Sequence, residues 1–332
     1  ATALAFLYFR EAHVEHAVIE VGLGGRLDAT NVVAPLVTVI ASISYDHMQV
    51  LGNTLAEIAG EKAGIIKPGV PLVTSAQAPE ALAVIERVAR ERGATLVRVG
   101  ADGAPGRDYS YRPGAYTSEW QRFDLTTPSG VLRDLELSLL GEHQLENAAA
   151  AVAAAEQLAA RGLPVTEEAI RTGLQGVRWP ARMQVVGRAP WVVVDGAHNA
   201  DSFARLFAAL RRHFSYSRGL LVLALMADKD ITGIAAEVTR ASLDRVICTT
   251  WNSARAATPE AVATALAGSI PAQQVTTAPD VGAALSDALA LAQPDDLVVV
   301  AGSVAFAGAA LRWLAAHTEE GARAIEIAGM DH

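Results

Sequence analysis

Short apolar runs alternate with helical segments along most of the chain, and this alternation limits the possible fold more than any other feature. In the second half, apolar runs lie at 191–195, 220–225, 245–250 and 297–302, and a helical pattern follows each of them. The connections between these elements are short, as they are in right-handed crossovers between parallel strands. This half is therefore predicted to form a parallel, doubly wound sheet.

The first half shows the same alternation with more irregular segments. A helical pattern opens the chain, a capping box begins a further helix at Thr54, and the Gly, Pro and Tyr residues of 100–116 indicate a loop. The other expected elements are strands at 16–21, 37–44, 72–75 and 95–99, a helix at 79–92, a β-hairpin at 121–140 and helices at 145–161 and from 166. This half is therefore predicted to be α/β as well.

The pattern restarts near Gly176–Pro180, where we place a domain boundary. A chain of 332 residues is long enough for two domains of about 150 residues each. We therefore expect one domain at 1–178 and a second, Rossmann-like domain at 179–332. Closure of the two domains over a cleft would require a hinge, which we expect at 176–181.

Composition narrows the possible functions. Hydrophobic residues make up 51% of the chain and charged residues 19%, a balance that excludes disordered and collagen-like chains. The single cysteine, Cys248, leaves no intrachain disulfide and fits a reducing cytoplasm. A net charge of −9 provides no overall positive field for nucleic acid or an anionic membrane. An anionic substrate would therefore need a local binding site.

One stretch, 297–316, approaches membrane-spanning length, but Gly302 and Ser303 interrupt it and Arg312 lies within it. We interpret it as a strand, a turn and an amphipathic helix. The N-terminus lacks the basic region of a signal peptide. We therefore expect a cytoplasmic protein without a membrane span, and a monomer, since no exposed apolar stripe requires a partner.

Polar side chains follow two expected strands of the first half. Glu20 is the penultimate residue of the strand at 16–21, and Asp46 and His47 follow the strand at 37–44. Ligands bind at the carboxyl ends of parallel strands, and two acids with an imidazole suit Mg²⁺ that also keeps water and phosphate ligands. Polar residues that merely cap loops are an equally good interpretation.

A lysine falls on the inner face of the helix that begins after the capping box. The spacing of Leu55, Ile58 and Ala59 predicts that Lys62 points inward, which is unusual for a lysine. Either its amine escapes to water at the helix end, or it faces the same crevice as the acids and the imidazole.

The glycine-rich stretch at 20–31 fails the spacing of a dinucleotide fingerprint, because the third glycine position holds Leu27 and no helical pattern begins there. The sequence contains no Gly-Lys pair and hence no Walker A loop. Neither H-E-x-x-H, paired C-x-x-C nor G-x-S-x-G occurs. These absences argue against a Rossmann cofactor, a zinc protease and a serine hydrolase.

A second polar cluster follows the first strand of the second half. Asp195, His198 and Asn199 lie between that strand and a helix N-terminus, where backbone N–H groups favour phosphate. Arg182, just beyond the boundary, could neutralise phosphate. The alternative is that Asn199 or Asp201 acts only as a helix cap.

Five segments match the successive motifs of one family in order and spacing. They are EVGLGGRLDATNVV (20–33), SYDHMQVLGNTLAEIAGEKAGIIKPG (44–69), LLGEHQLENAAAA (139–151), WPARMQ (179–184) and DGAHN (195–199). On these motifs the chain resembles the folylpolyglutamate synthase/dihydrofolate synthase family of the Mur ligase superfamily. The resemblance implies a partial Mur-ligase-type ATPase domain followed by a Rossmann-like, doubly wound C-terminal domain.

The resemblance also implies an ATP-dependent amide ligase. In that family ATP converts the carboxylate of dihydropteroate, or the γ-carboxylate of a folate glutamyl tail, to an acyl phosphate. The amine of L-glutamate then attacks, and ADP and phosphate leave. The implied substrates are therefore ATP, L-glutamate and folate or dihydropteroate.

Matching the motifs residue by residue assigns roles. Glu20 and His47 correspond to Mg²⁺ ligands, and Lys62 to a lysine that becomes a carbamate and binds a second Mg²⁺. The remaining matches are Asn147 on the adenine side and Arg182, Asp195 and His198 at nucleotide-contacting positions. The resemblance thus implies catalytic roles for Lys62 and His198.

The sequence differs from the family pattern at one point. The family has a phosphate-binding P-loop upstream of the position of Glu20, and this sequence begins after it. We therefore expect a fragment of a longer protein in preference to a degenerate homologue. The 332-residue chain alone is expected not to ligate glutamate to a folate.

Two other functions remain open. One is a cell-wall Mur ligase that joins an amino acid to a nucleotide-sugar carboxylate. The other is a truncated module that binds folate or nucleotide without catalysis. The residues that bind glutamate are open too, because a structural role is the simpler interpretation of Arg255 and Ser303 at their strand ends.

Overall fold

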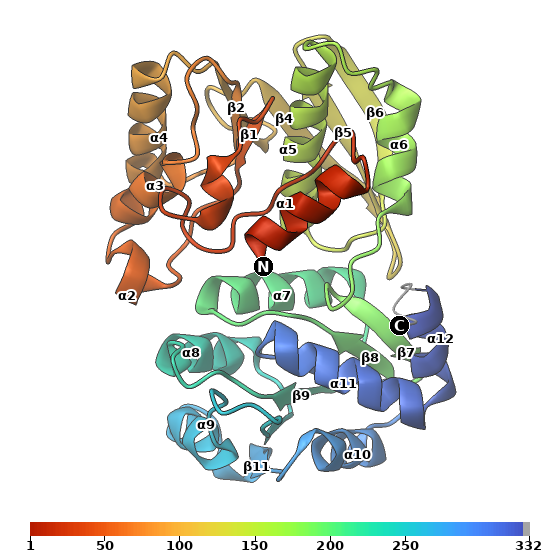
Figure 1. Ribbon diagram of the computed structural model, residues 1–332. Helices are drawn as coiled ribbons and strands as arrows, with labels where there is room; N and C mark the ends of the chain where they lie inside the picture. Colours follow the sequence, from red (N-terminus) through yellow and green to blue (C-terminus); the bar gives the residue numbers. More distant parts are fainter. Residues whose placement is uncertain (328–332) are drawn as a thin grey trace. The chain divides into compact units, whose positions relative to one another are not determined.

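The computed structural model describes residues 1–327, and the chain forms two compact units (Figure 1). Unit 1 consists of residues 1–113, 123–135 and 145–172, and unit 2 of residues 114–122, 136–144 and 173–332.

The first sheet has six strands whose order follows the chain, from β1 to β6. They are β1 (Thr38–Ile40), β2 (Leu72–Thr74), β3 (Leu96–Ala101), β4 (Tyr109–Tyr116), β5 (Gln121–Thr127) and β6 (Gly130–Leu137). The pairs β1–β2, β2–β3 and β3–β4 are parallel. A two-residue turn at 128–129 joins β5 and β6, which confirms the hairpin predicted at 121–140.

The helices of this half agree closely with their sequence signals. They are α1 (Thr2–Glu11), α2 (Met48–Leu51), α3 (Leu55–Ala63), α4 (Pro79–Glu91), α5 (Glu142–Ala159) and α6 (Glu167–Gly176), with a 3₁₀ turn η1 (Ala29–Val32). The capping box before α3 is present, because the Thr54 hydroxyl accepts the Glu57 N–H and the Glu57 carboxylate accepts the Thr54 N–H. Buried Ile58 and Ile85 on α3 and α4 then pack with Leu72 of β2.

Two strand predictions in this half are wrong. Residues 16–21 form no strand: they do not pair with the sheet, whose first strand is β1, and Val18 is fully exposed. A β-strand needs a neighbour for its backbone hydrogen bonds, so apolar content alone did not produce one. Conversely, the predicted loop at 100–116 contains β4, because Tyr109 and Tyr111 alternate into the core and pair with β3.

The second sheet lies in unit 2 and has the order β11-β10-β9-β12-β8-β7. Its strands are β7 (Gln184–Arg188), β8 (Trp191–Val194), β9 (Gly219–Leu223), β10 (Arg245–Cys248), β11 (Val275–Thr277) and β12 (Leu297–Ala301). All neighbours are parallel except β7, which pairs with β8 in antiparallel fashion. The doubly wound prediction is confirmed, whereas the edge strand β7 was not anticipated.

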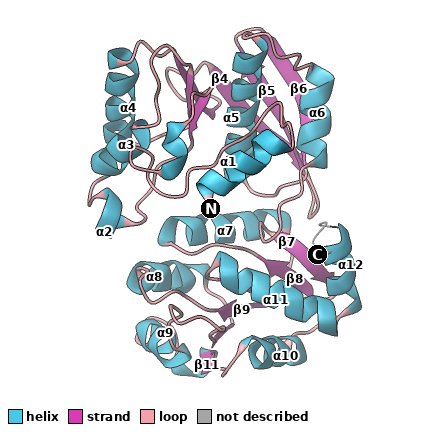
Figure 2. Cartoon of the chain, viewed as in Figure 1, coloured by secondary structure: helices cyan, strands magenta, loops and turns pink. Residues whose placement is uncertain are grey.

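Helices cover both faces of this second sheet (Figure 2). They are α7 (Ala200–His213), α8 (Ile231–Ala241), α9 (Pro259–Leu266), α10 (Val281–Leu291), α11 (Val304–His317) and α12 (Glu319–Ile327), with a 3₁₀ turn η2 (Ala272–Gln274). Phe203 of α7 and Ile234 of α8 belong to the core on one face, and Leu285 of α10 and Phe306 of α11 to the core on the other.

The chain reverses its direction of winding within the second sheet. β12 lies between β8 and β9, while β10 and β11 continue outward from β9. In open α/β sheets, ligands bind beyond the carboxyl ends of strands at such a switch point.

None of the helices among residues 1–327 combines the length and the hydropathy that a membrane crossing requires. The segment 297–316 contains β12 and α11, as its strand–turn–helix interpretation predicted.

Candidate functional site

In unit 1, an imidazole and a carboxylate form a pair in the segment after β1. His47 has left-handed backbone geometry (φ 51°) and is the N-cap residue that precedes α2. Its N–H donates to Asp46 Oδ1 at 2.8 Å, and its Nε2 lies 3.8 Å from Asp46 Oδ2. The side chains of Asp46 and His47 therefore lie close together, as their adjacent positions in the sequence suggested.

Lys62 lies in the last turn of α3 and is half-buried. The neighbouring residue Ala63 and Ala59, one turn earlier, are buried in the core of unit 1. Burial lowers the pKa of the Lys62 amine, and the negative charge of Asp46 opposes that shift. The amine is therefore partly withdrawn from water within electrostatic reach of the carboxylate that pairs with His47.

Glu20 does not lie at a strand end, which corrects the expectation for 16–21. It is exposed in an irregular segment. Across residues 1–327, no three His, Cys, Asp or Glu side chains gather as a metal site. The Asp46 carboxylate beside His47 still provides oxygen donors of the kind that Mg²⁺ accepts when water and phosphate complete its shell.

Asn147 lies on α5, where its side chain is exposed. The preceding residue, Glu146, is buried, and its Oε2 accepts a hydrogen bond from Gln77 Nε2 at 3.4 Å. The helix therefore presents Asn147 at the surface of unit 1 while its neighbour joins the interior.

In unit 2, Asp195 follows β8 and is only 8% exposed. Its Oδ1 accepts the Ala197 N–H at 2.7 Å, and its Oδ2 accepts the Met183 N–H at 2.8 Å. Burial raises the pKa of this carboxyl, while those two N–H groups and the charges of Arg182 and His198 act in the opposite direction. Asp195 thus ties the loop that carries Arg182 to the end of β8.

Arg182 lies between two residues with left-handed backbone, Ala181 (φ 56°) and Met183 (φ 44°). Its Nη1 lies 2.5 Å from the point where a side chain on Gly196 would place its Cβ. Because Gly196 has no side chain, the guanidinium can pack against the turn that precedes α7.

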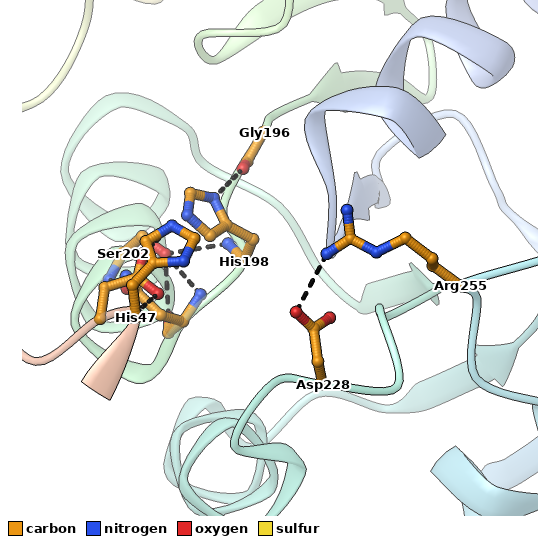
Figure 3. Close-up of polar contacts among 8 residues, drawn as sticks. His47, Gly196, His198, Ser202, Asp228 and Arg255 are labelled. Atoms are coloured by element: carbon orange, nitrogen blue, oxygen red, sulfur yellow. Dashed lines mark hydrogen bonds and ion pairs between the residues drawn. The ribbon is translucent and has the colours of Figure 1, made fainter. Parts of the chain in front are cut away.

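His198 lies beside Gly196 and Ser202 at the start of α7 (Figure 3), and Asn199 is the next residue. His198 Nδ1 lies 2.9 Å from the carbonyl oxygen of Gly196 and donates a hydrogen bond to it. Asn199 caps α7, because its Oδ1 accepts the Ser202 N–H at 2.8 Å. The cap interpretation of Asn199 is confirmed, whereas Asp201 pairs with Arg205.

The structure groups Arg182, Asp195 and His198 at one place in unit 2, the N-terminus of α7 beyond β8. A guanidinium and a helix N-terminus in this arrangement favour a phosphate group.

Arg255 and Ser303, the two strand-end residues left open as glutamate ligands, both make contacts within unit 2. Arg255 Nη2 forms an ion pair with Asp228 Oδ2 at 3.0 Å, between the segments that follow β9 and β10 (Figure 3). Ser303 caps α11, because its Oγ accepts the Ala305 N–H at 3.3 Å. The simpler structural interpretation therefore accounts for the contacts of both Arg255 and Ser303.

Sequence reasoning did not single out His143, although it lies in the GEHQLEN segment. Burial, reinforced by the charges of Arg205 and Arg182, lowers its pKa to about 4, against a small opposing effect of Asp201. The histidine is therefore neutral at pH 7 in the folded protein.

This pKa predicts a loss of stability in mild acid. As pH falls from 6.5 toward 4, the unfolded chain binds a proton that folded His143 does not, so unit 2 loses about 2 kcal/mol between pH 8 and pH 5. All five tryptophans lie in unit 2, so urea unfolding followed by tryptophan fluorescence measures this change. His143→Gln should remove this part of the pH dependence of the free energy of unfolding. His317→Gln, at an exposed histidine, should leave that pH dependence unchanged. Equal pH dependence of the two variants would contradict the assignment.

Two family profiles match most of the chain. The profile described as Mur ligase middle domain matches residues 2–155, and the profile described as Mur ligase, glutamate ligase domain matches residues 181–304.

Two individual relatives carry folylpolyglutamate synthase in their names. Dihydrofolate synthase/folylpolyglutamate synthase of Bacillus subtilis is 44% identical over 69% of this chain and 52% of its own length. Folylpolyglutamate synthase of Lacticaseibacillus casei is 40% identical over 72% of this chain and 55% of its own length. The chain thus spans about half the length of these curated relatives.

A solved structure is similar to nearly the whole chain. The Mycobacterium tuberculosis folylpolyglutamate synthase complexed with ADP matches with a TM-score of 0.86 and 34% identity, over 94% of this chain and 71% of that one.

Proposed function

This chain belongs to the folylpolyglutamate synthase/dihydrofolate synthase family of Mur ligases, and on that premise we propose that the protein carrying it is an ATP-dependent glutamate ligase. Its acceptor is dihydropteroate, the γ-carboxylate of a folate glutamyl tail, or both. The likeness to the ADP-bound mycobacterial enzyme carries this proposal. The phosphate-binding geometry at the N-terminus of α7 supports it.

In the proposed reaction, the acceptor carboxylate attacks the γ-phosphorus of ATP, which forms an acyl phosphate and releases ADP. The amine of L-glutamate then attacks the acyl carbon, loses a proton and expels phosphate, which leaves an amide. Phosphoryl transfer depends mainly on alignment and charge neutralisation. Arg182 supplies positive charge, the N-terminus of α7 supplies N–H donors, and Asp195 holds the Arg182 loop in place. Asn147 is assigned to the adenine side.

His198 is proposed to act at the nucleotide. Its Nδ1 donates to the Gly196 carbonyl, which orients the ring at the start of α7.

The proposed magnesium ligands are Glu20 and His47, with Lys62 as a carbamate at a second position. Bound Mg²⁺ would neutralise phosphate charge. Burial lowers the pKa of the Lys62 amine, and only a neutral amine can add carbon dioxide to form a carbamate. The adjacency of Asp46 and His47 supports a cation at this end of unit 1.

The test is ADP release, with ATP, Mg²⁺ and L-glutamate, by the purified longer protein that carries this chain, since the 332-residue chain alone is expected to be inactive. Each of three acceptors is supplied in turn: dihydropteroate, a folylmonoglutamate and a UDP-muramoyl substrate. Release with either of the first two, with the glutamylated product seen by mass spectrometry, is expected. Release only with the UDP-muramoyl substrate would reassign the protein to the cell-wall ligases. Nucleotide binding without release would leave a non-catalytic binding module.

A monomeric state and a cytoplasmic location complete the proposal. The single cysteine supports a reducing compartment. Light scattering of the purified protein and fractionation of cells test these two points.

A further inference from the structure

The glycine-rich segment 22–31, here called the clamp loop, contacts the last turn of α3, which carries Lys62. The Arg26 N–H donates to the carbonyl oxygen of Glu61 at 2.8 Å. The Arg26 guanidinium also bonds to Glu61 Oε1, with Nη2 at 2.8 Å and Nε at 3.1 Å. One residue of the loop therefore holds both the backbone and the side chain of the residue before Lys62.

Two glycines allow the backbones to approach this closely. A Cβ on Gly25, which is buried, would lie 2.9 Å from the carbonyl oxygens of Glu61 and Lys62. A Cβ on Gly64 would lie 2.4 Å from the Cα of Arg26. Neither glycine has a positive φ, so the requirement here is space and not backbone conformation. Any side chain at Gly25 would displace the clamp loop or the turn that holds Lys62.

Asn31 closes the contact from the other end of the loop. Its Nδ2 donates to the carbonyl oxygen of Arg26 at 3.1 Å and to that of Gly64 at 3.2 Å. Lys67 Nζ in turn donates to the carbonyl oxygen of Asn31 at 2.7 Å. Carbonyl groups in the last turn of a helix lack partners within the helix. Here the clamp loop supplies partners for those of Glu61 and Gly64.

The loop is itself held in shape by Asp28. The Asp28 carboxylate accepts the N–H groups of Leu23 at 3.0 Å and of Thr30 at 2.9 Å. Hydrogen bonds from the side chain and backbone of Thr30 lower its pKa, so it is ionised at neutral pH. The clamp loop is thus a preformed unit.

We propose that Gly25, Arg26 and Asn31 are positioning residues that fix the last turn of α3 and, through it, the Lys62 side chain. The proposal rests on the role proposed for Lys62 at the magnesium site. It assigns a function to the glycine-rich stretch, whose spacing does not match a dinucleotide fingerprint: Gly25 makes room for the end of α3. Such supporting contacts change metal affinity or activity by about 10- to 100-fold when they are lost.

The test compares Gly25→Ala with Gly60→Ala. Gly60 lies on the same helix, and a Cβ there would meet nothing within 4 Å. Gly25→Ala should weaken binding of Mn²⁺, a spectroscopic substitute for Mg²⁺, about tenfold in the presence of ADP, as measured by electron paramagnetic resonance. It should also raise the half-saturating Mg²⁺ concentration in the ligase assay, with the KM for L-glutamate unchanged. Gly60→Ala should match the unmodified protein in all three measurements.

A milder variant covers the case in which Gly25→Ala does not fold. Asn31→Ala removes two hydrogen bonds without adding bulk, and it should shift Mn²⁺ affinity in the same direction by about threefold. If Gly25→Ala and Asn31→Ala bound Mn²⁺ with unchanged affinity and kept their ligase activity, the positioning role of the clamp loop would be wrong and the proposed function would stand. If the unmodified protein did not bind Mn²⁺, both the positioning role of the clamp loop and the proposed magnesium site would be wrong.

Discussion

Lys62→Arg is expected to lower the kcat of glutamate ligation about a thousandfold, although it keeps a positive charge. The amine it replaces is half-buried, and burial lowers its pKa, which favours the neutral form that reacts with carbon dioxide. A guanidinium stays protonated and cannot form the carbamate. The loss should therefore appear in kcat measured at saturating ATP and glutamate.

This substitution separates two possible roles of the side chain. If Lys62 acted as a simple cation on phosphate, an arginine would retain much of the rate. Retention of more than about a tenth of kcat would therefore contradict the carbamate assignment. Gly60→Ala, in the same helix, is the control for changes to α3 itself and should keep the unmodified rate.

Gly302→Ala is expected to destabilise unit 2 by about 4 kcal/mol. Gly302 follows β12 with φ 133°, a conformation that side chains rarely adopt. A Cβ there would also lie 2.2 Å from the carbonyl oxygen of Ala224, in the segment that follows β9. Backbone strain and backbone overlap act together, and neither can relax without separating two central strands.

Urea unfolding followed by tryptophan fluorescence measures this effect, since the five tryptophans report on unit 2. The control is Gly308→Ala in α11, where the nearest atom to the added Cβ is Arg312 Nη1 at 3.7 Å. That change should stabilise slightly, because alanine favours a helix more than glycine does. If the two variants unfolded at the same urea concentration, the turn after β12 would tolerate a side chain and the prediction would be wrong.

Local patterns predicted the elements that depend on nearby residues. The helices α7 and α8 follow the apolar runs at 191–195 and 220–225, as predicted, because caps and apolar spacing lie within each segment. The predictions failed where the formation of a strand depended on a neighbouring strand to pair with. Segment 16–21 is apolar but has no strand beside it, whereas β4 forms within a Gly- and Pro-containing segment because β3 supplies its partner.

In the candidate site, too, features that depend on nearby residues were predictable and contacts between separate segments were not. The spacing of the apolar residues of α3 predicted an inward Lys62, and the residue is half-buried beside the core. The motif DGAHN predicted a polar cluster before α7, where Asp195 and His198 lie. The two uses of the Asp195 carboxylate were not predictable, because one of its partners, Met183, belongs to a different segment with left-handed backbone.

The order of strands and helices, the helix caps and the family of this chain follow from its sequence, since each depends on residue type and spacing along the chain. Only the tertiary structure revealed that Gly25 and Gly64 bring the clamp loop against the end of α3, and that Asp195 holds the Arg182 loop. Those contacts join backbone atoms of separate segments, and backbone atoms are chemically alike at every position. No pattern of side chains can therefore specify which of them meet until the chain has folded.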